Sequence, residues 1–291
     1  MPNVSIIIPT RNEGDNIKFL LERLSLSLAE SQYEAEIIFV DDGSTDTTRE
    51  EIREYAVPLN VHLICRDDEI GLATAVCAGA KAARGDLLIV MDADLSHPPE
   101  AIPDLLQPLV QGSHDMVIGS RYIPGGATPE WPFARRLASR FATLPARLFT
   151  EVHDPLAGFF AVRREVLLSI NGPVAGFKIG LEILASAGDW LRVTEIPITF
   201  ADRTKGRSKM TVRVMVDYLR HIAILGGLAL DIVRKKELAM LAGTVVSLDL
   251  LAFHLWRTLG FQLDVVHIIS FLLACNLGYL ITAATTQTPL S

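Results

Sequence analysis

Residues 87–99 read Leu87-Leu-Ile-Val-Met-Asp-Ala-Asp-Leu-Ser-His-Pro-Pro99, and this stretch decides the fold. Five consecutive apolar residues without alternation predict a strand that is buried on both faces of a parallel sheet. Pro98 and Pro99 prevent the strand from continuing. The strand therefore brings Asp92 and Asp94 to the carboxyl edge of the sheet, where ligands bind in open α/β folds.

The two aspartates are separated by a single residue. Alternate residues of a strand point to the same side, so we expect the carboxylates of Asp92 and Asp94 to reach one hard cation. Mg²⁺ usually takes one or two carboxylates together with substrate phosphates. An Asp-x-Asp after a strand can also simply begin a turn, and the rest of the chain has to decide between these two interpretations.

The composition of the 291-residue chain indicates a catalytic domain with an added membrane part. Hydrophobic residues make up 49% of the chain, and its mean hydropathy of +0.32 is high for a soluble protein. The net charge of −7 argues against a general nucleic-acid binder. The 3 cysteines show no metal-ligand spacing and are typical of a reducing compartment. The first apolar run, residues 4–8, is too short for a signal peptide.

The first 120 residues alternate short apolar runs with amphipathic segments. The runs at 4–8, 35–40, 61–65, 87–91 and 116–119 predict strands, and the segments that follow them predict helices. Asp15 or Asn16 is expected to cap the first helix, and Ser44 or Thr45 the second. This order predicts a doubly wound, mainly parallel sheet with right-handed crossovers.

Polar and acidic residues also follow the first two strands, at residues 9–13 and 41–46. Acidic strand ends on one edge repel one another, which favours a site that holds a cation or a hydrogen-bonding ligand. Neither Gly-x-Gly-x-x-Gly after the first strand nor a P-loop motif occurs, which argues against dinucleotide and P-loop sites. A phosphate-receiving aspartate domain is expected to carry a lysine after a later strand, where this chain has Gly119-Ser-Arg121.

An ordered set of motifs covers about the first 210 residues. The motifs are Pro9-Thr-Arg-Asn-Glu13, Asp41-Asp-Gly-Ser-Thr-Asp46, Gly71-Leu-Ala-Thr-Ala75, Asp92-Ala-Asp-Leu-Ser-His-Pro-Pro-Glu100, Gly119-Ser-Arg-Tyr122, Asp154-Pro-Leu-Ala-Gly-Phe-Phe160, Gly176-Phe-Lys-Ile-Gly-Leu-Glu182 and Phe200-x-x-Arg-x-x-Gly-x-Ser-Lys209. Each motif is weak alone, whereas the ordered set is specific. The set resembles the family-2 inverting glycosyltransferases, specifically the polyprenol- or dolichol-phosphate mannose synthases.

The resemblance implies a catalytic domain of the GT-A type that binds a nucleotide-sugar and Mg²⁺ or Mn²⁺. It implies a nucleotide pocket lined by Pro9, Arg11, Glu13, Val40 and Asp42. It implies that the metal and the diphosphate are held by Asp92, Ala93 and Asp94, with Ser96 where some relatives carry a metal-ligating Gln. It implies donor phosphate contacts from Arg121, Arg203 and Lys209, and acceptor phosphate contacts from Arg121, Arg136 and Ser139.

Residues 131–150 combine arginines with apolar residues at helical spacing. This pattern is typical of an amphipathic helix at a membrane surface, and equally of an ordinary surface helix. The resemblance favours the membrane surface, with Arg136 and Ser139 beside the phosphate of a lipid acceptor.

The chain beyond Lys209 changes character. Residues 211–236 suggest interfacial helices, and residues 238–256 and 265–283 are about long enough to cross a bilayer. Basic residues precede the first span, so the positive-inside rule places the catalytic domain in the cytosol. A buried helical hairpin is the alternative. Asp249 lies within the first span and would pair with the other span or with a neighbouring subunit, so a homo-oligomer is one expectation.

Three functions remain open from the sequence. The favoured one transfers mannose from GDP-mannose to dolichyl or polyprenyl phosphate with inversion. The second transfers glucose or another hexose from a UDP-sugar to the same lipid, and the third is a membrane-anchored nucleotide-sugar binder without catalysis. A lipid monophosphate is largely ionised near neutral pH, with a second pKa of about 6, so neither transfer needs a strong general base.

Overall fold

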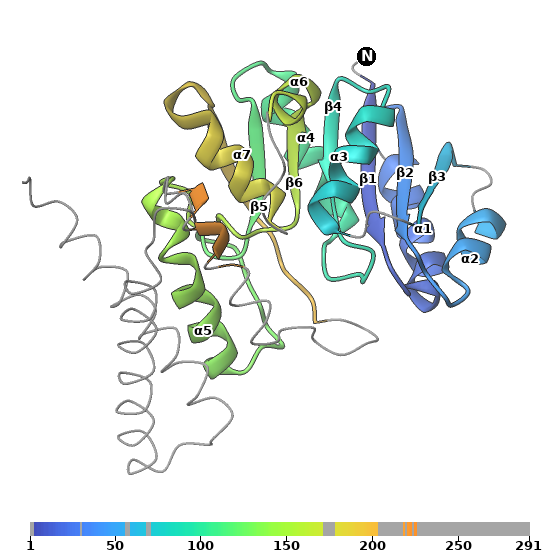
Figure 1. The fold of residues 1–291 in the computed structure, drawn as a ribbon, viewed down its shortest axis with the longest axis horizontal. Helices are drawn as coiled ribbons and strands as arrows, with labels where there is room; N and C mark the ends of the chain where they lie inside the picture. Colours follow the sequence, from blue (N-terminus) through green and yellow to red (C-terminus); the bar gives the residue numbers. More distant parts are fainter. Residues whose placement is uncertain are drawn as a thin grey trace, which may run out of the picture. The chain divides into compact units, whose positions relative to one another are not determined.

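The computed structural model describes residues 3–29, 31–55, 59–67, 71–170, 178–202, 218, 220–222 and 224–225. The chain divides into two compact units, and the coloured ribbon of Figure 1 shows the described elements of both. The first unit comprises Met1–Glu130 and Phe149–His221. The second comprises Trp131–Leu148 and Ile222–Ser291.

The first unit contains a seven-stranded sheet with the strand order β3-β2-β1-β4-β6-β5-β7 (Figure 1). The strands are β1 (Val4–Thr10), β2 (Ala35–Asp42), β3 (Val61–Arg66), β4 (Leu87–Val90), β5 (Met116–Ser120), β6 (Phe160–Arg163) and β7 (Val193–Pro197). β1 pairs in parallel with β2 and β4, β2 with β3, and β5 with β7. β6 runs antiparallel to β4 and β5. The prediction of a mainly parallel sheet is confirmed, whereas β6 and β7 were not predicted.

Helices cover both faces of this sheet. One face is covered by α1 (Gly14–Ala29), α2 (Thr48–Tyr55) and α4 (Ile102–Val110), the last preceded by the 3₁₀ turn η1 (Pro99–Ala101). The other face is covered by α3 (Leu72–Ala82), α6 (Arg164–Leu168) and α7 (Ile179–Ala187), the last followed by the 3₁₀ turn η3 (Gly188–Trp190). In β1, Ile6 and Ile8 join the first core and Ile7 joins the second, as the alternation of a strand requires.

α3 approaches the sheet closely because it is built from small residues. A Cβ atom added to Gly79 would lie 2.6 Å from Cγ2 of Ile7, closer than side chains pack. Ala73, Ala75 and Ala80 are also buried on this helix. The small residues therefore let the backbone of α3 lie directly on β1 and β2.

The helix starts differ from the predicted caps. α1 begins at Gly14, before Asp15 and Asn16, because the backbone N–H of Gly14 donates to the carboxylate of Asp46 at 3.1 Å. α2 begins at Thr48, and the same carboxylate accepts the backbone N–H of Thr48 at 3.1 Å. One acid in the loop after β2 thus caps two helices, a tertiary arrangement that local cap rules do not contain.

The second unit contains α5 (Phe133–Thr143) and the 3₁₀ turn η2 (Ala146–Leu148). The guanidinium of Arg135 lies 4.1 Å from the ring centroid of Trp131. Phe133 is 72% exposed and Leu148 is 56% exposed. The predicted helix is confirmed, and its position at a membrane surface stays a prediction.

Among the described residues, no helix is both long and apolar enough to cross a bilayer. The predicted spans at 238–256 and 265–283 lie outside those residues, as does Asp249. Of the predicted interfacial segment 211–236, only residues 218, 220–222 and 224–225 are described, and they are helical.

Candidate active site

The loop that follows β4, residues 91–97, is held at the carboxyl edge of the sheet. We call it the metal loop. β4 ends at Val90, and the backbone N–H of Met91 makes a last sheet bond to the carbonyl of Ile7 at 3.2 Å. The chain then turns sharply, with Leu95 in the left-handed region at φ 65°. A bulky residue in this region is strained, and such strain gathers at functional sites.

The carboxylates of Asp92 and Asp94 differ in their surroundings. The Asp92 side chain is 38% exposed. Asp94 is 4% exposed, and its Oδ1 accepts the hydroxyl of Ser96 at 2.6 Å and the backbone N–H of Ser96 at 3.1 Å. Because β4 ends before Asp92, the pleat of a strand does not orient these side chains, so that part of the sequence argument is wrong. The turn of the metal loop orients them instead.

The donor set of the metal loop fits a hard divalent cation. Carboxylate oxygens are the ligands that Mg²⁺ and Mn²⁺ prefer. Gly158 lies beside Asp92, since a Cβ atom there would lie 3.4 Å from Oδ2 of Asp92, at van der Waals contact. Among the described residues, no group of three or more His, Cys, Asp and Glu is arranged to hold a metal. Diphosphate oxygens and water would therefore complete the coordination of a cation held by Asp92 and Asp94.

Ser96 was expected to stand beside the metal. Its side chain is buried, and its hydroxyl donates to Asp94. Its carbonyl accepts the backbone N–H of Ala201 at 3.2 Å. Ser96 therefore orients Asp94 and fastens the metal loop to the segment after β7, and its role as a ligand stays a prediction.

The loops after β1 and β2 are joined into one structure. Asn12 has a left-handed backbone at φ 57°, its amide oxygen accepts the backbone N–H of Thr45 at 2.8 Å, and its own N–H donates to Ser44. The backbone N–H of Glu13 donates to the hydroxyl of Thr48 at 2.8 Å. Arg11 is exposed on this rim. The sheet register places Pro9 opposite Val40, so these predicted pocket residues lie on adjacent strands.

Asp42 and Asp41 already have cationic partners. Asp42 accepts the Nε of Arg66 at 2.8 Å and the backbone N–H of Gly71 at 2.9 Å. Asp41 is fully buried and accepts the Nε of Arg49 at 2.6 Å. A base that binds Asp42 therefore meets an acid–arginine pair. Arg66 was missed by the sequence analysis, and the β2–β3 register that pairs it with Asp42 is the signal that finds it.

Arg121 was expected to contact phosphates, and its guanidinium is held by Asp154. The Nε and Nη2 of Arg121 donate to the two carboxylate oxygens of Asp154, each at 2.7 Å, and the backbone N–H of Arg121 adds a third bond at 3.0 Å. Both side chains are buried, at 12% and 0% exposure. Glu195 of β7 accepts the backbone N–H of Asp154 at 3.0 Å. Arg121 thus joins β5 to the loop before β6, and a phosphate contact by it stays a prediction.

His97 is a second residue that the sequence analysis did not single out. Its ring is 2% exposed, and its Nδ1 accepts the backbone N–H of Asp92 at 2.9 Å. Burial lowers the pKa of His97 below its usual value, because removal from water disfavours the charged ring. The histidine follows the Asp-x-Asp in the sequence, but nothing in the pattern predicts that its ring turns back.

The structure gives no position relative to the metal loop for four of the predicted site residues. Arg203 and Lys209 lie outside the described residues. Arg136 and Ser139 lie on α5, in the second unit. Their contacts with a donor or an acceptor stay predictions.

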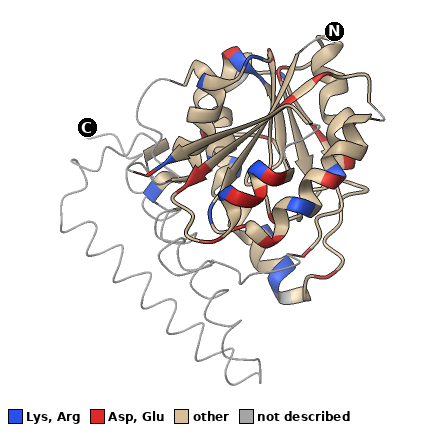
Figure 2. Ribbon diagram, turned by 90° about the vertical axis from the view of Figure 1, so that its right-hand side faces the viewer, with Lys and Arg blue, Asp and Glu red and all other residues tan. Residues whose placement is uncertain are grey.

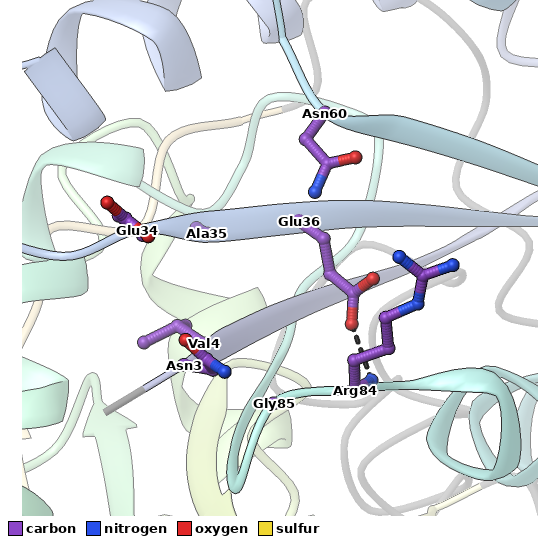
Figure 3. A pocket seen from close by; sticks show the side chains of 8 residues that line it. All are labelled: Asn3, Val4, Glu34, Ala35, Glu36, Asn60, Arg84 and Gly85. Carbon is purple, nitrogen blue, oxygen red and sulfur yellow. Dashed lines mark hydrogen bonds between the residues drawn. The ribbon is translucent and has the colours of Figure 1, made fainter. Parts of the chain in front are cut away.

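A pocket at the opposite edge of the sheet is unrelated to these residues. Glu34, Glu36, Asn60 and Arg84 line part of it (Figure 3). Glu36 accepts the hydroxyl of Ser5 at 2.5 Å and the backbone N–H of Arg84 at 2.6 Å. These bonds lower the pKa of Glu36, against burial, which would raise it. The Glu36 carboxylate therefore joins the start of β1 to the segment before β4, and the predicted site residues of the strand ends lie at the other edge.

Comparisons with known proteins identify the family of this chain. Residues 5–170 match the model of glycosyl transferase family 2. The dolichol-phosphate mannosyltransferase of Pyrococcus furiosus is 44% identical over 223 residues, which is 75% of this chain and 62% of that protein. The enzyme of the same name from Saccharomyces cerevisiae is 40% identical over 75% of this chain and 85% of its own length. The polyprenol monophosphomannose synthase of Mycolicibacterium smegmatis is 37% identical over 71% of this chain and 80% of its own length.

A solved structure shares the fold. Glucosyl-3-phosphoglycerate synthase from Mycobacterium tuberculosis, crystallised with Mn²⁺, UDP-glucose and phosphoglyceric acid, has a TM-score of 0.58 and 22% identity, covering 76% of this chain and 80% of that one. At this identity the likeness concerns the fold alone, which is the GT-A type of mixed α/β sheet. With the family match and the relatives at 37–44% identity, the chain belongs to glycosyl transferase family 2 and is a glycosyltransferase related to the dolichol-phosphate mannosyltransferases.

Proposed function

We propose that the protein transfers mannose from GDP-mannose to dolichyl or polyprenyl phosphate, with inversion at the sugar. The observation that carries this proposal is the metal loop with Asp92 and Asp94 at the carboxyl edge of a family-2 glycosyltransferase sheet. The names of the relatives support mannose and a polyprenol-type acceptor.

The donor would lie across the ends of β1, β2 and β4. The base and ribose would meet Pro9, Arg11, Glu13, Val40 and the Asp42–Arg66 pair, and the diphosphate would reach Asp92, Ala93 and Asp94. Mg²⁺ or Mn²⁺ bound there neutralises the charge that develops on the leaving diphosphate. Arg203 and Lys209 would add positive charge to the same phosphates.

The acceptor would attack without a strong general base. A lipid monophosphate is largely ionised near neutral pH, so its oxygen is already a nucleophile. Arg121, Arg136 and Ser139 would orient that phosphate, since guanidinium groups bind phosphate through two parallel hydrogen bonds. The buried acids then serve for positioning: Asp154 holds Arg121, and Oε2 of Glu182 lies in hydrogen-bond contact with Nε2 of His221 at 2.8 Å.

The membrane arrangement is part of the proposal. Residues 1–210 would form the catalytic domain on the cytosolic side, residues 211–236 would lie at the interface, and residues 238–256 and 265–283 would cross the bilayer. A homo-oligomer would give Asp249 a partner. Cysteines introduced near Gln262 should react with an impermeant reagent outside intact cells, and cysteines near Gln287 should not. Extraction of the protein by carbonate would refute the two spans.

The decisive experiment is a transfer assay on membranes that contain the full chain. Labelled GDP-mannose and labelled UDP-glucose are supplied with and without polyprenyl phosphate. We expect label in the lipid only with GDP-mannose and only when polyprenyl phosphate is present. Transfer from UDP-glucose would replace the donor in the proposal. Nucleotide-sugar binding without transfer from any donor would favour a non-catalytic binder.

A further inference from the structure

His97 is a buried polar side chain that the proposed transfer does not use. Its ring stacks on Phe159, with centroids 5.1 Å apart and planes 13° from parallel. The ring of Phe200 meets it edge-on at 5.4 Å. An imidazole held between two aromatic rings cannot turn freely, so both of its nitrogens have fixed directions.

The geometry fixes which nitrogen carries the proton. Nδ1 accepts the backbone N–H of Asp92 at 2.9 Å, and a ring nitrogen that accepts a hydrogen bond carries no proton. The proton of the neutral ring is therefore on Nε2. Nε2 lies 3.9 Å from Oδ2 of Asp92, which is too long for a hydrogen bond. The ring thus acts on the backbone of Asp92 and leaves its carboxylate available.

The bond to Nδ1 replaces a lost sheet bond. The ladder of β4 ends with the N–H of Met91, so the next N–H, that of Asp92, has no strand partner. The left-handed backbone of Leu95 reverses the chain and returns His97 to that N–H, five residues back along the loop. The strained turn and the histidine therefore form one device that fixes the backbone of Asp92.

The same ring and carboxylate meet at Gly158. A Cβ atom on Gly158 would lie 3.3 Å from Cε1 of His97 and 3.4 Å from Oδ2 of Asp92. The loop before β6 therefore packs against both groups at once. We propose that His97 is a positioning residue, which holds the backbone of Asp92 through Nδ1 so that the Asp92 carboxylate is aimed at the divalent cation. This inference rests on the proposed metal site of the transfer reaction.

The test separates the acceptor atom from the ring. His97→Asn keeps an acceptor, because the Asn amide oxygen stands where Nδ1 stands. His97→Phe keeps the aromatic packing without the acceptor, and His97→Gln is polar but reaches past that position. The full chain is purified in detergent, and Mn²⁺ binding in the presence of GDP is measured by the loss of the free-Mn²⁺ electron paramagnetic resonance signal.

We expect His97→Phe and His97→Gln to weaken Mn²⁺ binding by about ten- to a hundredfold, the usual effect of losing a group that orients a metal ligand. His97→Asn should stay within about threefold of the wild type, the lower end of the effect of one hydrogen bond. GDP binding without metal should be unchanged in all three variants. A general disturbance of the fold would weaken GDP binding as well, so this measurement is the control. If His97→Phe does not fold, the comparison of Mn²⁺ binding between His97→Asn and His97→Gln tests the proposal.

Two outcomes overturn the inference. Equal Mn²⁺ binding in the Asn and Gln variants would show that the acceptor atom has no part in metal binding. Absence of Mn²⁺ binding in the wild type would refute the metal site itself, and with it the proposed function. Because the assay contains neither sugar nor lipid, a wrong sugar or acceptor in the proposed function leaves its result unchanged.

Discussion

Two acidic loops stand at the same edge of the sheet, and they differ in how their charge is balanced. At the end of β2, directly before its loop, Asp41 is paired with Arg49 and Asp42 with Arg66, and both acids are almost completely buried. In the metal loop after β4, Asp92 is partly exposed, and among the described residues it has no ion pair with arginine or lysine. The acids at the end of β2 therefore have fixed cationic partners, whereas the partly exposed carboxylate of Asp92 is the one that binds a cation in the proposed function.

The comparison shows that an acid at a strand end does not by itself identify a metal site. Burying an unpaired charge is costly, so the buried Asp42 has a fixed cation, whereas the buried Asp94 is held by hydrogen bonds from Ser96 and Asp92 keeps contact with solvent. Figure 2 shows acidic and basic residues interspersed along the described helices.

The largest effect is expected in the metal loop. Asp94→Asn removes a charge without changing shape, so transfer should fall by about 10²- to 10³-fold, the effect of losing several kcal/mol of metal-dependent stabilisation. The unfolding temperature should hardly change. Asp104→Asn, an exposed acid on α4, is the matched control. Full transfer by Asp94→Asn, or by the wild type in excess chelator, would contradict the metal role.

The second prediction concerns the acid–arginine pair at the end of β2. Arg66→Met leaves Asp42 buried without its cation, and breaking a buried pair costs about 3–5 kcal/mol. The urea midpoint of unfolding should fall clearly, in contrast to Asp94→Asn. Arg53→Met on α2 is the control, since Arg53 is exposed. An unchanged urea midpoint in Arg66→Met would contradict the claim that the buried Asp42 needs its cationic partner.

The third prediction, of smaller effect, distinguishes the donor site from the acceptor site. Arg136→Ala on α5 removes a charge-assisted contact worth about 1.5–3 kcal/mol, so the KM for polyprenyl phosphate should rise about ten- to a hundredfold. GDP binding by calorimetry should stay unchanged, whereas Asp42→Ala should weaken GDP and spare the lipid. Arg147→Ala is the control in the same unit. A loss of GDP affinity in Arg136→Ala would move the acceptor site away from α5.

The smallest effect concerns an arginine-paired acid away from both loops. Hydrogen bonds from Arg192, with burial opposing them, lower the pKa of Asp115 from 3.8 to about 2. A carboxyl with a lowered folded-state pKa stabilises the fold above its unfolded pKa and loses that contribution as the pH falls through about 2. The difference in unfolding temperature between wild type and Asp115→Asn should therefore be constant above pH 4 and shrink below it. A constant difference down to pH 2 would contradict the pairing.

The strands and the edge of the sheet could be predicted because their signals are local. Apolar runs such as Leu87-Leu-Ile-Val90 lie within one strand, and parallel strands bring their carboxyl ends together whatever their order. Helix starts were less predictable, since Asp46 caps α1 and α2 from a single loop. β6 escaped prediction because it has only 4 residues, Phe160–Arg163, too few to show a clear hydrophobic period.

The sequence by itself determined which residues stand at this edge: the motifs that contain Asp42, Asp92, Asp94 and Arg121, and through them the family. Only the tertiary structure decided what each of them touches. Arg66 reaches Asp42 across 24 residues of chain, and Arg121 reaches Asp154 across 33, because neighbouring strands and loops set those distances. The return of His97 to Asp92 depends on a single left-handed residue, Leu95. Charge pairing in a buried site is decided by geometry and desolvation, and neither is contained in the spacing of residues along the chain.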